Sequence, residues 1–172
     1  MTIADGLLQE LDQEALTTRR VLERVPDDQL SWRPHARART LGELALHVAM
    51  VPGAVAELVT SPSPAQAPQF ADPTPASAAE LLPALDESLA KARKALSGLD
   101  DAAVMEPWRM MQGERELFAL PRAVLLRNIM LNHWYHHRGQ LLVYLRMHNV
   151  ALPSVYGPTA DENPFAVAMA AQ

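Results

Sequence analysis

A proline-rich segment, residues 61–76, constrains the fold of this chain more than any other feature of its sequence. It holds five of the chain's 14 prolines, and proline lacks the backbone N–H that the interior of a helix requires. The segment therefore cannot be helical, and it is long enough to cross from one end of a helical domain to the other. We expect a crossover connection between the elements on either side of it.

Two stretches before this segment have the spacing of amphipathic helices. In residues 3–25, apolar side chains recur at three- and four-residue steps. Residues 40–43 (TLGE) form a capping box, in which the Thr and Glu side chains each satisfy a backbone N–H at the start of a helix, and the apolar pattern then continues to about Val59. Within this second stretch, Pro52 and Gly53 predict a kink or an irregular turn.

Two further helical stretches follow the proline-rich segment. Residues 77–80 (SAAE) are a second capping box and open the third stretch. Residues 121–148 are the fourth and form the longest apolar-rich stretch of the chain. Between them, residues 108–120 have no helical period, and the Gln-Gly pair at 112–113 indicates a short hairpin or a loop.

Four helical stretches joined by one long crossover predict an all-α fold. We expect an up-down-down-up four-helix bundle with the proline-rich crossover between its second and third helices. Prolines and glycine after Asn149 predict an extended C-terminal tail that ends in one short helix at about residues 165–171. Runs of alternating polarity, which a β architecture would require, are missing. The length of 172 residues and the apolar content of 49% fit a single domain over residues 1–172.

Charge and composition exclude several classes of protein. The net charge of −5 and the lack of a basic run argue against nucleic-acid binding by phosphate neutralisation. The chain has no cysteine, so it has no disulfide, no thiolate nucleophile and no Cys-ligated metal. The longest apolar stretch, residues 44–59, is interrupted by polar residues and a Pro-Gly pair, so we expect no membrane span. Without the basic start of an export signal, a cytoplasmic protein is expected.

Three of the six histidines lie within residues 133–137. At about 100° per residue on a helix, His133 and His137 are about 40° apart on one face, where their side chains can converge on one ion. His136 lies on the other side of His133 and cannot easily share an ion with the adjacent His137. His47, in the second stretch, lies on the apolar face of its helix, so it is expected to point inward as well.

Three inward imidazoles on two helices would form a metal site whose fourth position stays open for water or substrate, as in catalytic zinc sites. Each observation also has a simpler interpretation. A lone His on an apolar face is more often a hydrogen-bonded core residue, and His pairs four residues apart arise by chance. The combination favours the metal site, because burying three neutral imidazoles without partners is costly. Spacing alone does not show that the two helices are neighbours.

The residues around His133 predict the direction in which its face points. An interior-facing arc within about 60° of His133 is predicted for four residues: Leu126, Ile129, Met130 and Tyr144. Four polar residues fall on the far side of the same helix: Arg127, Asn128, Arg138 and Arg146. A second apolar stripe opposite His133 must be covered by the tail or by a partner chain: Val124, Leu131, Leu142 and Leu145.

The remaining polar candidates have weaker patterns. His35 lies in a loop and is expected to be exposed, and His148 ends the fourth helix, where a C-terminal cap is a better role than a metal ligand. Glu43 is expected to cap the helix, and a role as a catalytic base is the less favoured alternative. Arg138 and Gln140 lie beside the His pair and could orient a ligand, bind an anion, or be surface or interface residues. The sequence has no phosphate-binding loop and no nucleophile elbow.

The sequence of residues 133–141, HWYHHRGQL, resembles the last-helix signature of the DinB-like (damage-inducible) superfamily. Residues 44–49 (LALHVA) are similar to the helix-two segment that supplies the first ligand of that family, and residues 153–162 are similar to the tail of one common branch. The resemblance covers essentially the whole chain. It implies an up-down-down-up four-helix bundle, often dimeric, in which three histidines hold a divalent ion, usually nickel or zinc. The matching ligands here are His47, His133 and His137, and His136 matches the non-ligand His of the family's HHRGQ run.

The resemblance also bears on the function of the chain. Characterised relatives are glutathione-like thiol S-transferases and a mycothiol-dependent isomerase, so a metal-dependent thiol S-transferase is favoured and a hydrolase is the weaker version. Any thiol must come from a low-molecular-weight cosubstrate, because the chain has no cysteine. The alternatives are a non-enzymatic metal-binding or stress-response bundle with a structural or incidental ion, and a bundle whose histidines are only core polar groups. The candidates for assisting groups are not ranked: Glu43, His136, Arg138 and Tyr144.

Overall fold

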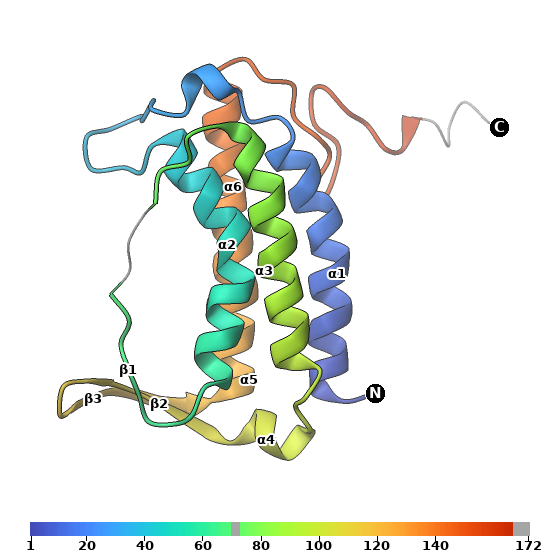
Figure 1. Cartoon of the computed structure of the whole chain (residues 1–172). Coiled ribbons are helices and arrows are strands. Elements are labelled where there is room, and N and C mark those ends of the chain that lie inside the picture. Colours follow the sequence, from blue (N-terminus) through green and yellow to red (C-terminus); the bar gives the residue numbers. More distant parts are fainter. Residues whose placement is uncertain (70–72, 167–172) are drawn as a thin grey trace.

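Four long helical rods lie side by side in the part of the chain that the computed structural model describes, residues 1–69 and 73–166 (Figure 1). The first three rods are α1 (Ile3–Leu22), α2 (Leu41–Thr60) and α3 (Leu81–Leu96). The fourth consists of α5 (Arg122–Leu125), a π-helical segment η3 (Leu126–Asn132) and α6 (His133–Met147) in succession. In Figure 1, α1 and α6 run upward, whereas α2 and α3 run downward.

The proline-rich segment connects opposite ends of the molecule, as its length predicted. The chain leaves the lower end of α2 at Thr60 and enters the upper end of α3 after a short 3₁₀ turn, η2 (Ala78–Glu80) (Figure 1). Just past α2, the backbone carbonyl of Ser61 accepts a hydrogen bond from Nε1 of Trp108, at 3.2 Å. The start of the crossover is therefore held against the chain segment that follows α3.

A three-stranded sheet at the lower end of the molecule corrects the expectation of an all-α fold (Figure 1). Strands β2 (Pro107–Gln112) and β3 (Arg115–Pro121) form an antiparallel hairpin, one of the two structures expected there. Its turn uses Gly113 at φ 61°, a left-handed conformation that glycine adopts without strain. Strand β1 (Ala65–Gln66) pairs in parallel with β2 and was not predicted, because a two-residue strand has no recognisable period.

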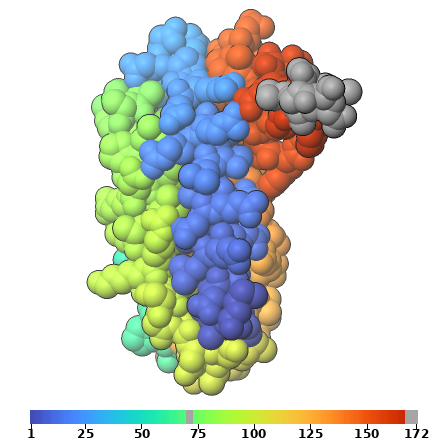
Figure 2. All heavy atoms as spheres, turned by 90° about the vertical axis from the view of Figure 1, so that its right-hand side faces the viewer, coloured from blue at the N-terminus to red at the C-terminus, as the bar shows by residue number. Residues whose placement is uncertain are grey.

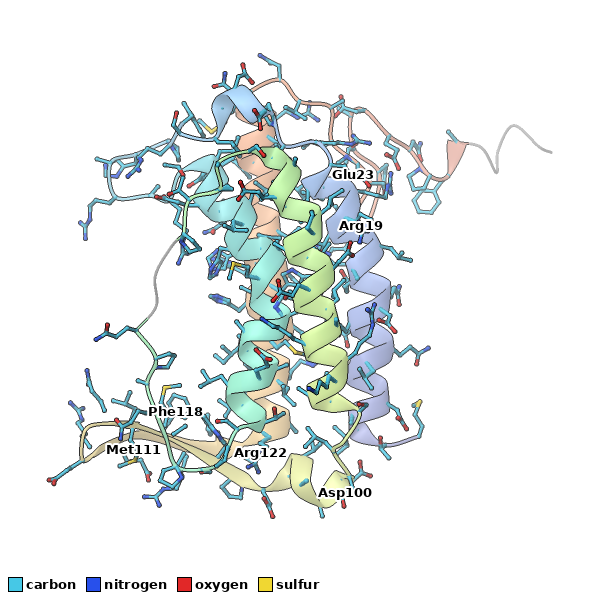
Figure 3. All side chains as sticks on the ribbon, viewed as in Figure 1. Arg19, Glu23, Asp100, Met111, Phe118 and Arg122 are labelled. Atoms are coloured by element: carbon cyan, nitrogen blue, oxygen red, sulfur yellow. The ribbon has the colours of Figure 1, made fainter. Side chains whose placement is uncertain are left out.

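The hairpin is fastened to the helices by an arginine at its end. Arg122, the first residue of α5, donates from Nε to the carbonyl of Val59 near the end of α2, at 3.1 Å (Figure 3). Its Nη1 donates to a carboxylate oxygen of Glu106 at 3.0 Å. Glu106 follows a short helix that the sequence analysis did not predict, α4 (Asp101–Met105). These bonds place the sheet at the base of α2 and α5, far from the upper turns of α6.

The two predicted capping boxes have different outcomes. At the start of α2, Thr40 Oγ1 accepts from the Glu43 N–H at 3.1 Å and a Glu43 carboxylate oxygen accepts from the Thr40 N–H at 2.7 Å, which confirms the first box. The box predicted at residues 77–80 is wrong, because the Ser77 side chain makes no cap bond. Asp27, from a distant segment, instead accepts from the Ala78 N–H at 2.6 Å.

Helix α2 runs without interruption through Pro52, so the irregular turn predicted there does not break the helix. The adjacent Gly53 allows α2 and α3 to approach closely, since a Cβ at this position would lie 2.5 Å from the backbone oxygen of Ser88. The Ser88 hydroxyl accepts from the Gly53 N–H at 2.8 Å and donates to the Met50 carbonyl at 3.0 Å. A side chain from α3 thus enters the backbone hydrogen-bond ladder of α2 at the proline.

Most of α2 is buried, and this accounts for its apolar sequence. Among the described residues it is the one helix long and apolar enough to cross a membrane, with a mean hydropathy of 1.4. However, 61% of that stretch is buried inside the protein, as expected for the core helix of a globular fold. The burial favours the interpretation of this apolar stretch as part of a core helix and not as a membrane span.

The interior-facing arc predicted around His133 is partly wrong. Leu126 and Met130 are fully buried, but Ile129 is 46% exposed. Residues 126–132 form a π-helix, whose i to i+5 bonds widen each turn, so the 100° step assumed for an α-helix does not hold there. His133 itself is only half-buried. The histidine face therefore borders on solvent and does not point to the centre of the core.

The C-terminal segment packs along α1, with no helix or strand between residues 149 and 164, as predicted (Figure 2). Arg20 on α1 donates to the carboxylate of Glu162 at 2.6 Å, and Arg24 donates to the carbonyl of Ala151 at 2.6 Å. The short helix predicted at residues 165–171 falls mostly outside the described part of the chain.

Candidate metal centre

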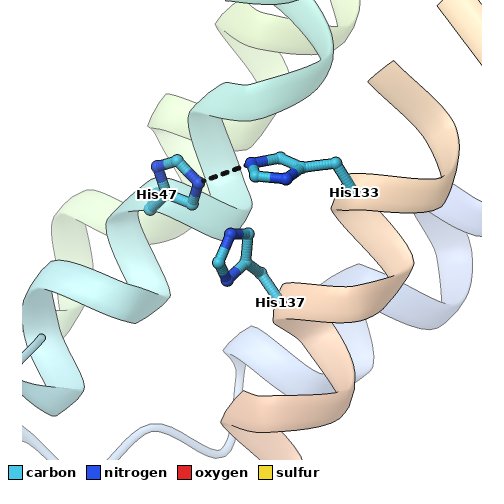
Figure 4. Close-up of side chains that lie close together, drawn as sticks. All are labelled: His47, His133 and His137. Atoms are coloured by element: carbon cyan, nitrogen blue, oxygen red, sulfur yellow. Dashed lines mark hydrogen bonds between the residues drawn. The ribbon is translucent and has the colours of Figure 1, made fainter. Parts of the chain in front are cut away.

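Three histidines from two helices meet between α2 and α6 (Figure 4). His47 projects from α2, and His133 and His137 project from α6 toward it. Each offers a ring nitrogen, and these three atoms all lie within 4.8 Å of one another. The Nε2 atoms of His47 and His133, 86 residues apart in the sequence, are separated by 3.2 Å. The structure thus brings together the three residues that the sequence singled out.

Local sequence explains how each helix presents its histidines. His133 and His137 are four residues apart in one α-helix, so their side chains lie on the same face, and their ring centroids are 4.3 Å apart. His47 lies near the capped start of α2, one turn after Glu43, where the two reciprocal bonds with Thr40 fix the beginning of the helix. Its ring centroid is 4.6 Å from that of His137 and 5.4 Å from that of His133.

The arrangement fits a divalent metal ion. Zinc–nitrogen bonds of about 2.0–2.1 Å in tetrahedral geometry place two ligand nitrogens about 3.3–3.4 Å apart, close to the 3.2 Å between His47 and His133. The three ring planes are mutually inclined by 78° to 89°, so the rings converge edge-on and do not stack. In the described part of the chain, no carboxylate joins this group of three.

Burial keeps two of the imidazoles neutral, which leaves lone pairs for a metal. Desolvation lowers the pKa of His133 below its ordinary value, and the positive charges of His136 and Arg39 lower it further. Desolvation also lowers the pKa of His137 to about 4, although its hydrogen bond to Gln140 acts in the opposite direction. Near neutral pH both rings are therefore unprotonated and able to coordinate.

Gln140 orients one of the three rings. Nδ1 of His137 lies 2.8 Å from Oε1 of Gln140, one turn along α6. Because an amide oxygen only accepts, Nδ1 carries the proton and Nε2 carries the lone pair. Ligating histidines commonly use their second nitrogen in this way, which fixes the tautomer and the ring direction. Of the roles left open for Gln140 in the sequence analysis, the structure supports orientation of a ligand.

Arg138 lies on the far side of α6, and this side faces α1. It is 1% exposed, and its Nη2 donates to the Glu14 carboxylate and to the Tyr156 hydroxyl, both at 2.6 Å. Its Nη1 donates to the Thr18 hydroxyl at 3.0 Å. The residue is thus a buried contact between helices, and it makes no hydrogen bond to the three histidines.

The other polar candidates do not belong to the group of three ligands. His136 is exposed, with its ring centroid 5.0 Å from that of His137, and it is not a member of the ligand group. Glu43 caps α2 as expected. His35 is exposed, and His148 occupies the C-cap of α6, where its ring meets Trp32 edge-to-face.

Arg39 is a site residue that the sequence analysis missed. Its charge lowers the pKa of both His133 and His137, so its guanidinium lies within electrostatic reach of the trio. Burial raises the pKa of the Tyr144 phenol, and the charge of Arg39 acts in the opposite direction. The Tyr144 hydroxyl lies 3.5 Å from the Arg39 carbonyl. The sequence feature that could have identified Arg39 is its position directly before Thr40, the N-cap of the helix that carries His47.

Comparisons with known proteins give one consistent result. A family model described as the DinB family matches residues 1–164. The uncharacterized protein YrdA of Bacillus subtilis is 26% identical over 160 residues, which cover 92% of this chain and 90% of YrdA. A DinB-like protein from Bacillus cereus has a similar structure, with a TM-score of 0.69 and 26% identity over 88% of this chain and 97% of that chain. The fold is also similar to that of the DinB-like protein YjoA from Bacillus subtilis, with a TM-score of 0.62 and 18% identity over 92% of this chain and 99% of that chain.

Proposed function

This chain belongs to the DinB family, and from that premise we propose that it binds one divalent metal ion, zinc or nickel, through His47, His133 and His137. The observation that carries the proposal is the convergence of three ring nitrogens within 4.8 Å on two helices. The lowered pKa of His133 and His137 supports it, because neutral imidazoles are the form that coordinates.

We further propose that the ion serves catalysis, with the favoured reaction a thiol S-transfer and hydrolysis the weaker version. Three histidines without a carboxylate among the described residues resemble the ligand set of zinc sites that keep a position for substrate or water. A divalent ion at such a position lowers the pKa of a bound thiol or water and so makes it a better nucleophile. The chain has no cysteine, so the thiol belongs to a low-molecular-weight cosubstrate.

The protein's own contribution to such a reaction is to orient its ligands and set the charge around them. Gln140 holds the ring of His137 so that Nε2 is available. The positive charge of Arg39 acts on the same ligands and favours an anionic group beside them. His136 and Tyr144 are the nearby titratable groups for proton transfer, and neither is favoured.

The finer features of the architecture belong to the same proposal. We assign the four rods to an up-down-down-up four-helix bundle in a single cytoplasmic domain that acts on small molecules and not on nucleic acid. A homodimer is the proposed assembly. Of the stripe expected to need a partner, Leu131 and Leu145 are fully buried and Leu142 is partly buried, whereas Val124 is exposed. Three apolar residues of the fourth rod outside that stripe are exposed as well: Ile129, Val143 and Met147. Light scattering tests the assembly, and a monomer contradicts it.

Elemental analysis of protein purified without an affinity tag tests metal binding. We expect about one zinc or nickel per chain, and loss of that ion in His47→Ala, His133→Ala and His137→Ala. His35→Ala is the matched control, since His35 is exposed and outside the ligand group. A metal-free protein that rejects added Zn²⁺ and Ni²⁺ would leave the histidines as core polar groups only.

Turnover of a generic electrophile with low-molecular-weight thiols tests the enzymatic part. The expected result is thiol-dependent turnover that His133→Ala abolishes and His35→Ala retains. If the metal-loaded protein shows no turnover with any such thiol, the result contradicts the S-transferase and favours a non-enzymatic metal-binding or stress-response protein.

A further inference from the structure

A hydrogen bond joins α2 and α6 directly beside the metal ligands. Val48 follows His47, and Trp134 follows His133. Nε1 of Trp134 donates to the backbone carbonyl of Val48 at 2.8 Å, and both residues are 0% exposed. This bond and the approach of the two histidine rings at 3.2 Å therefore connect adjacent positions on the same two helices.

Pro52 explains why the Val48 carbonyl can accept this bond. In an α-helix, the carbonyl of residue 48 accepts from the N–H of residue 52. Residue 52 is proline and has no N–H, yet α2 continues through it. The carbonyl would be buried without a partner, which is unfavourable, and the indole N–H of Trp134 satisfies it. The proline thus converts a backbone group of one helix into an acceptor for the other.

We propose that Pro52 and Trp134 act together as a positioning device that sets the register of α6 against α2, so that His133 meets His47. This inference rests on the proposed metal site. A slip of one residue along a helix is about 1.5 Å, a large change compared with the tolerance of a metal–ligand bond. A single buried bond, one residue from His47 on α2 and one residue from His133 on α6, limits such movement beside these two ligands.

The test separates satisfaction of the carbonyl from positioning of the ligands. Trp134→Phe removes the indole N–H and keeps an aromatic ring. In the double variant Pro52→Ala/Trp134→Phe, the backbone N–H gained at position 52 can satisfy the Val48 carbonyl within α2, and the bond between the helices remains absent. Zn²⁺ affinity is measured by competition with a chromophoric chelator, the visible spectrum of the Co²⁺-loaded protein reports ligand geometry, and urea unfolding of the metal-free protein reports stability.

We expect Trp134→Phe to lower Zn²⁺ affinity about tenfold, to change the Co²⁺ spectrum and to lower the urea midpoint. In the double variant, the urea midpoint recovers relative to Trp134→Phe alone, whereas the affinity and the spectrum do not. Trp108→Phe is the matched control: Trp108 is also buried and donates from Nε1 to a backbone carbonyl, that of Ser61, away from the histidines. It should lower the urea midpoint and leave Zn²⁺ affinity unchanged.

Two results overturn the positioning role while leaving the metal site intact. The first is unchanged Zn²⁺ affinity in Trp134→Phe, with the wild type binding normally. The second is recovery of affinity together with stability in the double variant, which would mean that the bond only satisfies a carbonyl. If the wild type binds no Zn²⁺ at all, the proposed function and the positioning of its ligands both fail.

Discussion

Oε1 of Gln140 lies 2.8 Å from Nδ1 of His137, so a neutral amide on the exposed face of α6 directs one ring of the histidine trio. We predict that Gln140→Ala lowers Zn²⁺ affinity by about 10- to 100-fold, because the ring loses the acceptor that fixes its tautomer and direction. Competition with a chelator measures the change. The urea midpoint should stay near that of the wild type, since the Gln140 side chain is on the surface.

Gln140→Glu provides the control for this prediction. A carboxylate at the same position still accepts from Nδ1–H, so we expect Zn²⁺ affinity at least equal to that of the wild type. Equal losses in Gln140→Ala and Gln140→Glu would show that the hydrogen bond does not orient His137.

The buried ion pair between Arg138 and Glu14 makes α6 dependent on α1. Its side chains are 1% and 10% exposed, so Arg138→Met leaves a carboxylate buried without its partner. We predict a loss of about 3–5 kcal/mol in the free energy of unfolding, measured by urea denaturation. Glu14→Gln/Arg138→Met removes both charges and should lose clearly less. A double variant as unstable as Arg138→Met would argue that packing, and not the buried charge, sets the cost.

Two glycines on long helices should respond to alanine in opposite directions. At Gly53, a Cβ would lie 2.5 Å from the Ser88 oxygen and 2.8 Å from its Cα, so Gly53→Ala forces α2 and α3 apart. We expect a loss of about 2 kcal/mol or more, in the range of overpacked cores. At Gly139 on α6, a Cβ would meet nothing within 4 Å, and the residue is exposed. Gly139→Ala should stabilise by up to about 1 kcal/mol through helix propensity. Thermal unfolding of both variants is the measurement.

Acid should weaken the metal-free protein through His137. Its pKa is about 4 in the folded protein, against an ordinary value of 6.5, so between these values the unfolded chain binds a proton that the folded chain does not. Through this residue, the free energy of unfolding is unaffected above about pH 6.5 and decreases as the pH drops toward 4. Below that, His137 is protonated in both states and causes no further decrease.

The comparison with His137→Gln isolates this contribution from other titrating groups. Without a titrating ring at position 137, the variant should lose less unfolding free energy than the wild type between about pH 7.5 and about pH 4.5, with both proteins kept in a chelator. Parallel pH profiles for the two proteins would contradict the assignment.

Much of the candidate site could be predicted from local sequence. A four-residue spacing places His133 and His137 on one face of any α-helix, and the capping box of residues 40–43 correctly marked the start of the helix that carries His47. The proline content of residues 61–76 likewise indicated a crossover. These predictions held because spacing, capping and the missing N–H of proline act within a few residues of backbone.

The errors arose where a distant segment competes with local sequence. At residues 77–80, the Glu80 N–H donates to the Ser77 carbonyl and the Glu80 carboxylate accepts from the Ala76 N–H, so the predicted box does not form, while Asp27 binds the Ala78 N–H. Strand β1 exists only because β2 lies beside it. Ile129 is exposed because the helix before His133 is π-helical, so that the assumed rotation per residue does not apply. For Arg138 the sequence left several roles open, and the contact with Glu14 on α1 decides that it is buried.

By itself, the sequence determined that four long helical stretches form, where the helix that carries His47 begins, and which histidines share a helix face, because these properties depend on backbone geometry over one or two turns. Only the tertiary structure decided that His47 meets His133 and His137, and that Arg138, Gln140 and Trp134 have three different roles on one helix. Contacts across 86 residues depend on how whole helices pack, and no local pattern specifies that packing.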